Sequence, residues 1–243
     1  MIRGLLGKKV GMTQIFDAEG NITPVTAIEV GPCVVLGLKE KPMKVVLGFG
    51  NVKESALNKP RSGFFKKLGV APLRRVQEFS STDNKEYSVG QELKADFFKP
   101  GDFVDISGIS IGKGFQGGMK RWNWGGGPAA HGSMHHRRVG SIGSSSDPSR
   151  VYRGQHMPGH MGMDKVTTQN LRVMNVDVEN NLVLVKGAVP GHKNGYLTIN
   201  KALKKAFRSL DEKREVVESK RNPMKQSKAA AKGGGSAKSG GKK

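Results

Sequence analysis

The sequence of 243 residues has one cysteine, few aromatic residues and no long apolar run. The single cysteine, Cys33, cannot form an internal disulfide or build a thiolate cluster, so we expect a small buried residue of a cytosolic protein. No stretch approaches the roughly 18 apolar residues that span a bilayer. Residues 1–9 lack the apolar core and cleavage site of a signal peptide. The sequence therefore predicts no membrane partner.

Acidic residues are also scarce, because 20 Asp and Glu face 41 Lys and Arg, for a formal net charge of +21. An excess of this size destabilises a compact monomer by self-repulsion, which a polyanion relieves. Each phosphate that meets a Lys or Arg also releases condensed counterions, which drives binding. The charge balance therefore indicates a nucleic acid partner.

Short apolar runs, many of them β-branched and separated by Gly, Pro and Asn, predict strands and favour a barrel or sandwich. Two runs on either side of a turn at residues 179–181 predict a hairpin, and one short helix is expected at residues 202–210. Strands are predicted at residues 25–30, 34–36, 45–49, 87–91, 103–108, 171–178, 182–186 and 196–199.

Residues 111–165 break this pattern. They hold 13 Gly, five of the six His, both Trp, eight Lys plus Arg and only two acids, with no apolar periodicity. A stretch this long without structure of its own is either disordered or functional. We therefore divide the chain into a β body at residues 1–110 and 166–210, with a mixed basic segment at about 51–100, a basic insertion at 111–165 and a basic tail at 211–243. Within the tail, residues 219–243 have no acids and are expected to be disordered alone.

The glycine-rich run at residues 112–118 does not match a P-loop, because the glycine, lysine and Ser/Thr spacings differ. Glycines that let the backbone approach a nucleic-acid strand fit better. Trp122 and Trp124 lie among cations and are suited either to stacking on unpaired bases or to packing at the edge of a core. Asp147, Asp164 and the serines at 141–146 form no catalytic constellation.

The histidines raise a metal hypothesis, because His131/His135 and His156/His160 have the i, i+4 spacing of helical ligand pairs. Gly132 and a Pro-Gly pair at 158–159 interrupt these pairs, so a helix is not expected. We therefore expect the histidines to form hydrogen bonds to RNA or to stack on it, and no metal or other cofactor is predicted.

Several motifs resemble the bacterial form of the large-subunit ribosomal protein L-three family. They are GKKVGMTQIF (7–16), GKGFQG (112–117), KRWN (120–123), HGS (131–133), GSIG (140–143), VTTQNL (166–171) and NLVLVKGAVPG (181–191). The resemblance implies a barrel like that of translation factors on the subunit surface, with the insertion threading between ribosomal RNA helices toward the peptidyl transferase centre. It also implies direct ribosomal RNA binding, a role early in subunit assembly, neighbouring ribosomal proteins as partners, no small-molecule substrate and no enzymatic activity.

From the residues and the resemblance together, we expect ribosomal RNA to contact Lys8, Lys9, Lys113, Gly114, Lys120, Arg121, Trp122, Trp124, His131, His135, His136, Arg137, Arg138, Arg150, Arg153, His156, His160 and Lys165. The arginines are favoured for phosphate contacts, because a guanidinium matches phosphate geometry bidentately.

The chain departs from the family pattern at two places. Some relatives carry a methylated glutamine in a Gly-Gln-Met-Gly quartet, where residues 159–162 here read Gly-His-Met-Gly. The tail also extends past the point near residue 210 where many relatives end. Two rival functions stay open at this stage: a metal-dependent hydrolase that uses the histidines, and a chaperone-like or chromatin-like protein that coats nucleic acid generically.

Overall fold

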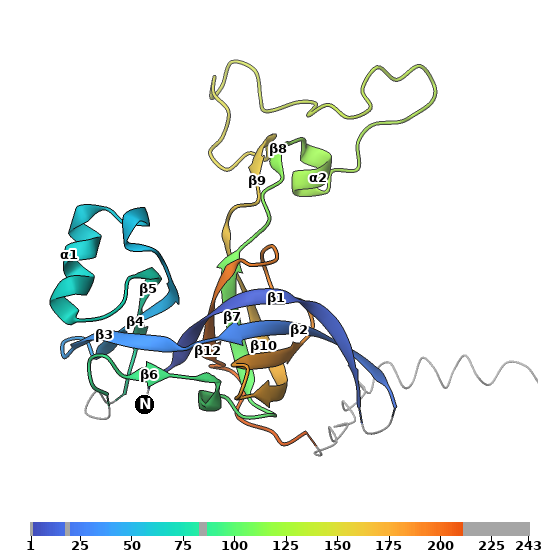
Figure 1. The fold of residues 1–243 in the computed structure, drawn as a ribbon. Helices are drawn as coiled ribbons and strands as arrows, with labels where there is room; N and C mark the ends of the chain where they lie inside the picture. Colours follow the sequence, from blue (N-terminus) through green and yellow to red (C-terminus); the bar gives the residue numbers. More distant parts are fainter. Residues whose placement is uncertain (1, 18–19, 83–86, 211–243) are drawn as a thin grey trace, which may run out of the picture. The chain divides into compact units, whose positions relative to one another are not determined.

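The computed structural model describes residues 2–17, 20–82 and 87–210, all within one compact unit, Met1–Leu210 (Figure 1). The predicted disordered tail lies outside these residues. Among the described helices, none is long and apolar enough to cross a membrane. Strands hold far more of the described residues than helices do, which confirms the prediction of a mainly β protein.

Six antiparallel strands close into a barrel, so that none of them has an open edge. Around the barrel they are β1 (Gly4–Phe16), β12 (Tyr196–Lys201), β7 (Phe103–Ile109), β10 (Lys165–Asp177), β11 (Leu182–Lys186) and β2 (Ile22–Val30).

The barrel interior is filled by alternate side chains of these strands, as the period of two dictates. Its fully buried residues include Ile28, Val104, Ile106, Val183, Val185 and Ile199. Register shifts in the β1–β2, β7–β10 and β10–β11 pairs mark bulges, which bend the strands around the barrel. The predicted hairpin at residues 171–186 is confirmed as β10 and β11.

The strands expected at residues 34–36 and 45–49 belong to a second sheet. Its order is β5 (Leu73–Ser80), β4 (Lys44–Asn51), β3 (Cys33–Lys39) and β6 (Glu92–Leu93). One hydrophobic cluster joins Val35, Val45 and Leu47 of this sheet to Leu5 and Leu197 of the barrel. The two sheets therefore share a core.

Helix α1 (Lys59–Leu68) covers the second sheet by packing Phe65 against Leu36 and Leu73 (Figure 1). The sequence contains its boundary signals, which are Asn58 at the N-cap, a proline in the first turn and Gly69 at φ 66° after the last turn. Short 3-10 turns, η1 (Glu54–Ala56) and η2 (Ala95–Phe97), precede α1 and β7.

Two sequence predictions are wrong. Residues 87–91 form a turn rather than a strand, where the Gly90 amide donates to the Val35 carbonyl at 2.8 Å. Residues 202–210 form no helix. They form bends and irregular structure after β12, where the Ala202 amide donates to the Phe103 carbonyl at 2.8 Å and the Arg208 amide to the Gly101 carbonyl at 3.3 Å. These long-range hydrogen bonds outweigh the helix propensity of the segment.

Cys33 is fully buried and donates to the Leu6 carbonyl at 3.3 Å, as the sequence analysis expected of a core cysteine. Burial raises the pKa of its thiol to about 12 from the ordinary 9.0. The folded state therefore holds this proton more tightly than the unfolded state. Its contribution to stability is fully present below about pH 9 and is lost as the pH rises toward 12.

We expect iodoacetamide to leave the native protein unmodified at pH 8 and to alkylate Cys33 fully in guanidinium chloride, because the thiolate is the reacting species. Mass spectrometry of both samples measures the difference. Rapid alkylation of the native protein would contradict the buried position.

Candidate nucleic-acid interface

The insertion, residues 111–165, leaves the barrel from β7 and returns to it in β10 (Figure 1). Gly108 pairs with Val166 and Ile109 with Lys165, so adjacent strands hold its two ends. Beyond this point, β8 (Gly114–Gln116) pairs with β9 (Gly159–Met161). These paired segments, residues 109–116 and 159–165, form a two-stranded neck that the sequence analysis did not predict.

Beyond the neck, the insertion has no hydrophobic core. Within residues 111–165 only Gly118 and Gly162 are buried, and neither has a side chain. Phe115 is 77% exposed and Met134 is 90% exposed. Exposed large apolar side chains on this scale indicate a surface that another molecule covers.

The base of the insertion is nevertheless organised by a stack of three side chains. The Trp122 and His156 rings lie 4.0 Å apart and 2° from parallel, and the Arg121 guanidinium lies 4.9 Å from the centre of the Trp122 ring. Arg121 Nη1 and Trp122 Nε1 both donate to the Met157 carbonyl at 2.8 Å. These contacts tie helix α2, on the outgoing part of the insertion, to the returning segment before β9.

Trp124 packs on the short helix α2 (Gly118–Trp122), from which it is separated by Asn123 in the left-handed conformation. A Cβ atom at Gly118 would lie 1.9 Å from the Trp124 ring, so only glycine permits this contact. Both tryptophans therefore contact other residues of the insertion, and stacking on unpaired bases stays a prediction.

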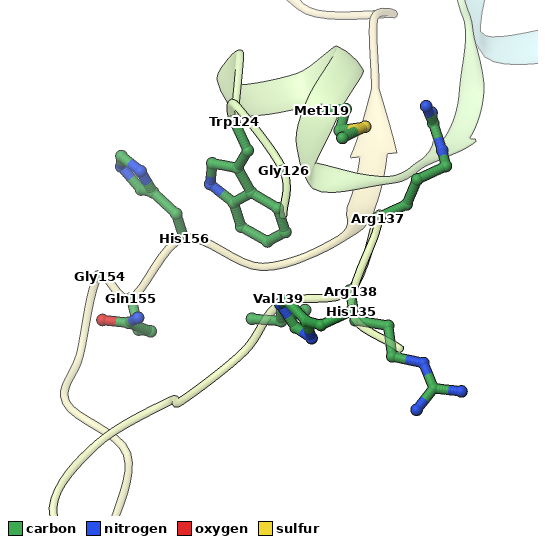
Figure 2. A pocket seen from close by; sticks show the side chains of 10 residues that line it. All are labelled: Met119, Trp124, Gly126, His135, Arg137, Arg138, Val139, Gly154, Gln155 and His156. Carbon is green, nitrogen blue, oxygen red and sulfur yellow. The ribbon is translucent and has the colours of Figure 1, made fainter. Parts of the chain in front are cut away.

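An open pocket of about 430 Å³ lies beside Trp124 (Figure 2). Arg137 and Arg138 extend from its wall in different directions (Figure 2). His136 Nδ1 lies 2.9 Å from the Pro128 carbonyl, and the Gly127 amide donates to the His136 carbonyl at 2.9 Å, which fixes the wall that carries these arginines. The other lining residues are Met119, Gly126, His135, Val139, Gly154, Gln155 and His156.

Most cations of the insertion have no internal partner. Within the described chain, no hydrogen bond or ion pair engages the side chains of Lys113, Lys120, Arg137, Arg138 and Arg153. Arg150 lies 5.5 Å from the Tyr152 ring centre. Cations without carboxylate partners create a positive field that attracts phosphates.

The remaining predicted contact residues are placed differently. Lys9 Nζ donates to the Val189 carbonyl at 2.8 Å and to the Gly191 carbonyl at 3.0 Å, so its charge stabilises a body loop. Lys8 lies half-buried in β1, and Lys165 begins β10. Gly114 and His160 belong to the paired neck strands, and His131 is exposed. RNA contact by any predicted residue stays a prediction.

The histidine pairs that suggested a metal lie outside helices, and His131 has a φ of 58°. Among the described residues, no group of three or more His, Cys, Asp or Glu side chains could hold a metal ion.

Exposed cations also occur on the body, where only Lys8 and Lys9 were predicted to contact RNA. Arg74 and Arg75 are exposed on β5, and Arg61 and Lys67 on α1. The sequence contains the boundary signals of helix α1 and the strand pattern of β5. These signals predict the two elements, but they do not indicate which of their cations face solvent.

Because both tryptophans of the chain lie in the insertion, their fluorescence reports its packing alone. We expect Gly118→Ala to displace the Trp124 ring, which shifts the emission to the red and increases quenching by acrylamide. The melting temperature of the body should change by less than about 2 °C. The matched control is Gly117→Ala, because a Cβ at Gly117 meets no atom within 4 Å. Equal spectra for the two variants would refute the packing described for Trp124.

Comparison with known proteins places this arrangement in a family. The model of the family described as "Ribosomal protein L3" matches residues 74–178, which include β7, the whole insertion and all of β10. The large ribosomal subunit protein uL3 of Acetivibrio thermocellus is 50% identical over 210 residues, which cover 84% of this chain and 99% of that protein. The similarity thus extends over the body as well as the insertion, and the chain belongs to the ribosomal protein L3 family.

Proposed function

We propose that this chain binds ribosomal RNA of the large subunit directly and that its insertion is the main interface. The observation that carries the proposal is a long insertion, held at its ends by barrel strands, that has no buried side chain. Six of its cations, Lys165 and the five named above, have no partner within the described chain. RNA would supply the packing and the counter-charge that the protein lacks.

Membership of the family makes the chain a structural constituent of the large ribosomal subunit, in the ribosome of the cytoplasm, and not an enzyme. Its contribution is therefore to the folding and stability of the particle rather than to a chemical step.

The interface would work in two parts. The stack of Arg121, Trp122 and His156 sets the direction of the insertion in advance, which lowers the entropy lost on binding. Arg137, Arg138 and the other free cations then neutralise phosphates that crowd together where RNA helices meet. RNA is recognised here through shape and unpaired bases, because side chains cannot read the deep, narrow major groove of A-form helices.

The location within the subunit follows from the family resemblance. The barrel, of the kind found in translation factors, would dock on the subunit surface beside neighbouring ribosomal proteins. The insertion would reach toward the peptidyl transferase centre and stabilise the RNA there. Binding would occur early in assembly, since later RNA helices must fold around the insertion. Residues 1–110 and 166–210 would then act as one docking body.

The neck supplies a clean test of the insertion. Because Gln116 pairs with Gly159, residues 117–158 can be replaced by a short Gly/Ser turn without disturbing β8 and β9. The barrel is expected to fold, because loop closure depends weakly on loop length. Particles reconstituted with the variant should assemble poorly or transfer peptides slowly. Circular dichroism, subunit profiles and peptidyl transfer rates measure these outcomes.

The salt dependence of RNA affinity distinguishes the contribution of the insertion's charges from that of its shape. The replacement removes Lys120, Arg121, Arg137, Arg138, Arg150 and Arg153. If each meets a phosphate, the slope of log K against log salt for large-subunit RNA should become less negative by about 4. A matched variant keeps the insertion and changes these six residues to Gln. Its slope should become less negative by the same amount, but it should keep part of the assembly activity. Normal assembly and an unchanged slope for the replaced insertion would refute the proposed function.

A further inference from the structure

A second candidate site lies on the body, in a groove of about 810 Å³ between β5 of the second sheet and the β7–β12 side of the barrel. The groove extends to the neck of the insertion at residues 109–112 and 163–165. Its volume lies within the range of about 300–1,000 Å³ that is typical of sites for small ligands. One nucleotide unit fits a space of this size.

One wall of the groove is held rigidly. The loop between β11 and β12 contributes residues 190–192, Asn194 and Gly195 to the lining. Lys9 Nζ clamps this loop through the Val189 and Gly191 carbonyls. Gly191 has a φ of 93°, and a Cβ there would lie 2.8 Å from the Ile109 carbonyl oxygen, so the loop approaches β7 as closely as glycine allows. A wall fixed in this way is formed before a ligand binds.

The charge of the groove has one sign. Arg74, Arg75 and Lys165 line it, no acidic residue does, and none of the three side chains has a hydrogen-bond or ion-pair partner within the described chain. The nearby Glu78 is engaged elsewhere, because its carboxylate pairs with Lys39 and Lys44. The groove is therefore suited to phosphates.

The floor beside these cations is apolar and exposed. Ile109 is 47% exposed, Ile111 57% and Met163 68%, and all three line the groove together with Tyr196. Gln77 Oε1 accepts from Thr198 Oγ1 at 2.9 Å, which leaves the amide nitrogen of Gln77 for another acceptor. The apolar surface suits the face of a nucleobase, the Gln77 amide suits its polar edge, and the flanking cations suit the adjacent phosphates.

We propose that this groove binds an unpaired nucleotide of single-stranded RNA, with the base on Ile109 and Met163 and the adjacent phosphates on Arg74, Arg75 and Lys165. The inference rests on the proposed function but concerns a different surface. It assigns a single-strand contact to the body and the adjoining neck, independent of the cations at residues 117–158. A peptide of a neighbouring protein fits less well, because three unpaired cations would then require acidic residues at matching positions.

The test uses the full chain and a uridine hexanucleotide that carries one 4-thiouridine, with crosslinked residues mapped by mass spectrometry. We expect crosslinks at Met163 or Tyr196. The double variant Arg74→Gln/Arg75→Gln should reduce these crosslinks roughly tenfold while crosslinks at residues 117–158 of the insertion stay unchanged. The matched control Arg61→Gln/Lys67→Gln removes the same charge from α1 and should leave the groove crosslinks within about twofold of the original protein.

Two further arms identify the source of the ligand. Competition by uridine monophosphate would show that one nucleotide suffices. Competition only by an unlabelled hexamer would show that a strand is needed, and either result supports the site. In purified large subunits, ultraviolet irradiation should crosslink the groove to RNA. A crosslink there to another protein would overturn the inference.

The inference and the proposed function fail separately. Crosslinks at residues 117–158 without any at Met163 or Tyr196 would overturn the groove alone. Groove crosslinks that the Arg74→Gln/Arg75→Gln variant leaves unchanged would also overturn it. Loss of all crosslinks, together with a salt-independent affinity for large-subunit RNA, would instead count against the proposed function.

Discussion

The antiparallel pairing of β7 with β10 is the constraint on which the rest of the molecule depends. It closes the barrel on one side and brings the two ends of the insertion to the spacing of adjacent strands. Strands that are far apart in sequence rarely pair without support from other contacts, because closing the intervening chain costs entropy. Here the barrel core around Val104, Ile106 and Val173 offsets that cost. The insertion can therefore lack a core and still have a defined origin and direction.

A rigid body and a charged, coreless extension make complementary contributions. The body is stabilised by apolar burial, which continues from the barrel into the second sheet. The insertion is shaped by few contacts, chiefly the stack of Trp122 on His156 and the packing of Trp124 on Gly118. Its cations remain available because only two acids, Asp147 and Asp164, lie in the segment. A polyanionic partner would supply the counter-charges and the packing that the folded chain does not provide for the insertion.

The strands that could be predicted are those with a strong local pattern, such as the hairpin of β10 and β11. The helix predicted at residues 202–210 is absent, because its local pattern does not decide its structure. Its residues favour a helix locally, but hydrogen bonds to the Phe103 and Gly101 carbonyls hold the chain in an irregular conformation. Strands β3 and β4 were also predicted as strands, yet nothing local distinguishes a strand of the barrel from one of the second sheet. The choice depends on which hydrophobic face meets which partner.

For the site, composition alone determined that residues 111–165 cannot build a core and carry excess positive charge, because both properties depend only on which residues are present. The tertiary structure decided which side chains are free to act. It engages Lys9 with the carbonyls of Val189 and Gly191, and it uses Trp122 to pack the insertion. It also brings Arg74, Arg75 and Lys165 into one groove, although β5 and β10 are far apart in sequence. The physical reason is that hydrogen bonding and packing between distant segments cannot be read from the local order of residues.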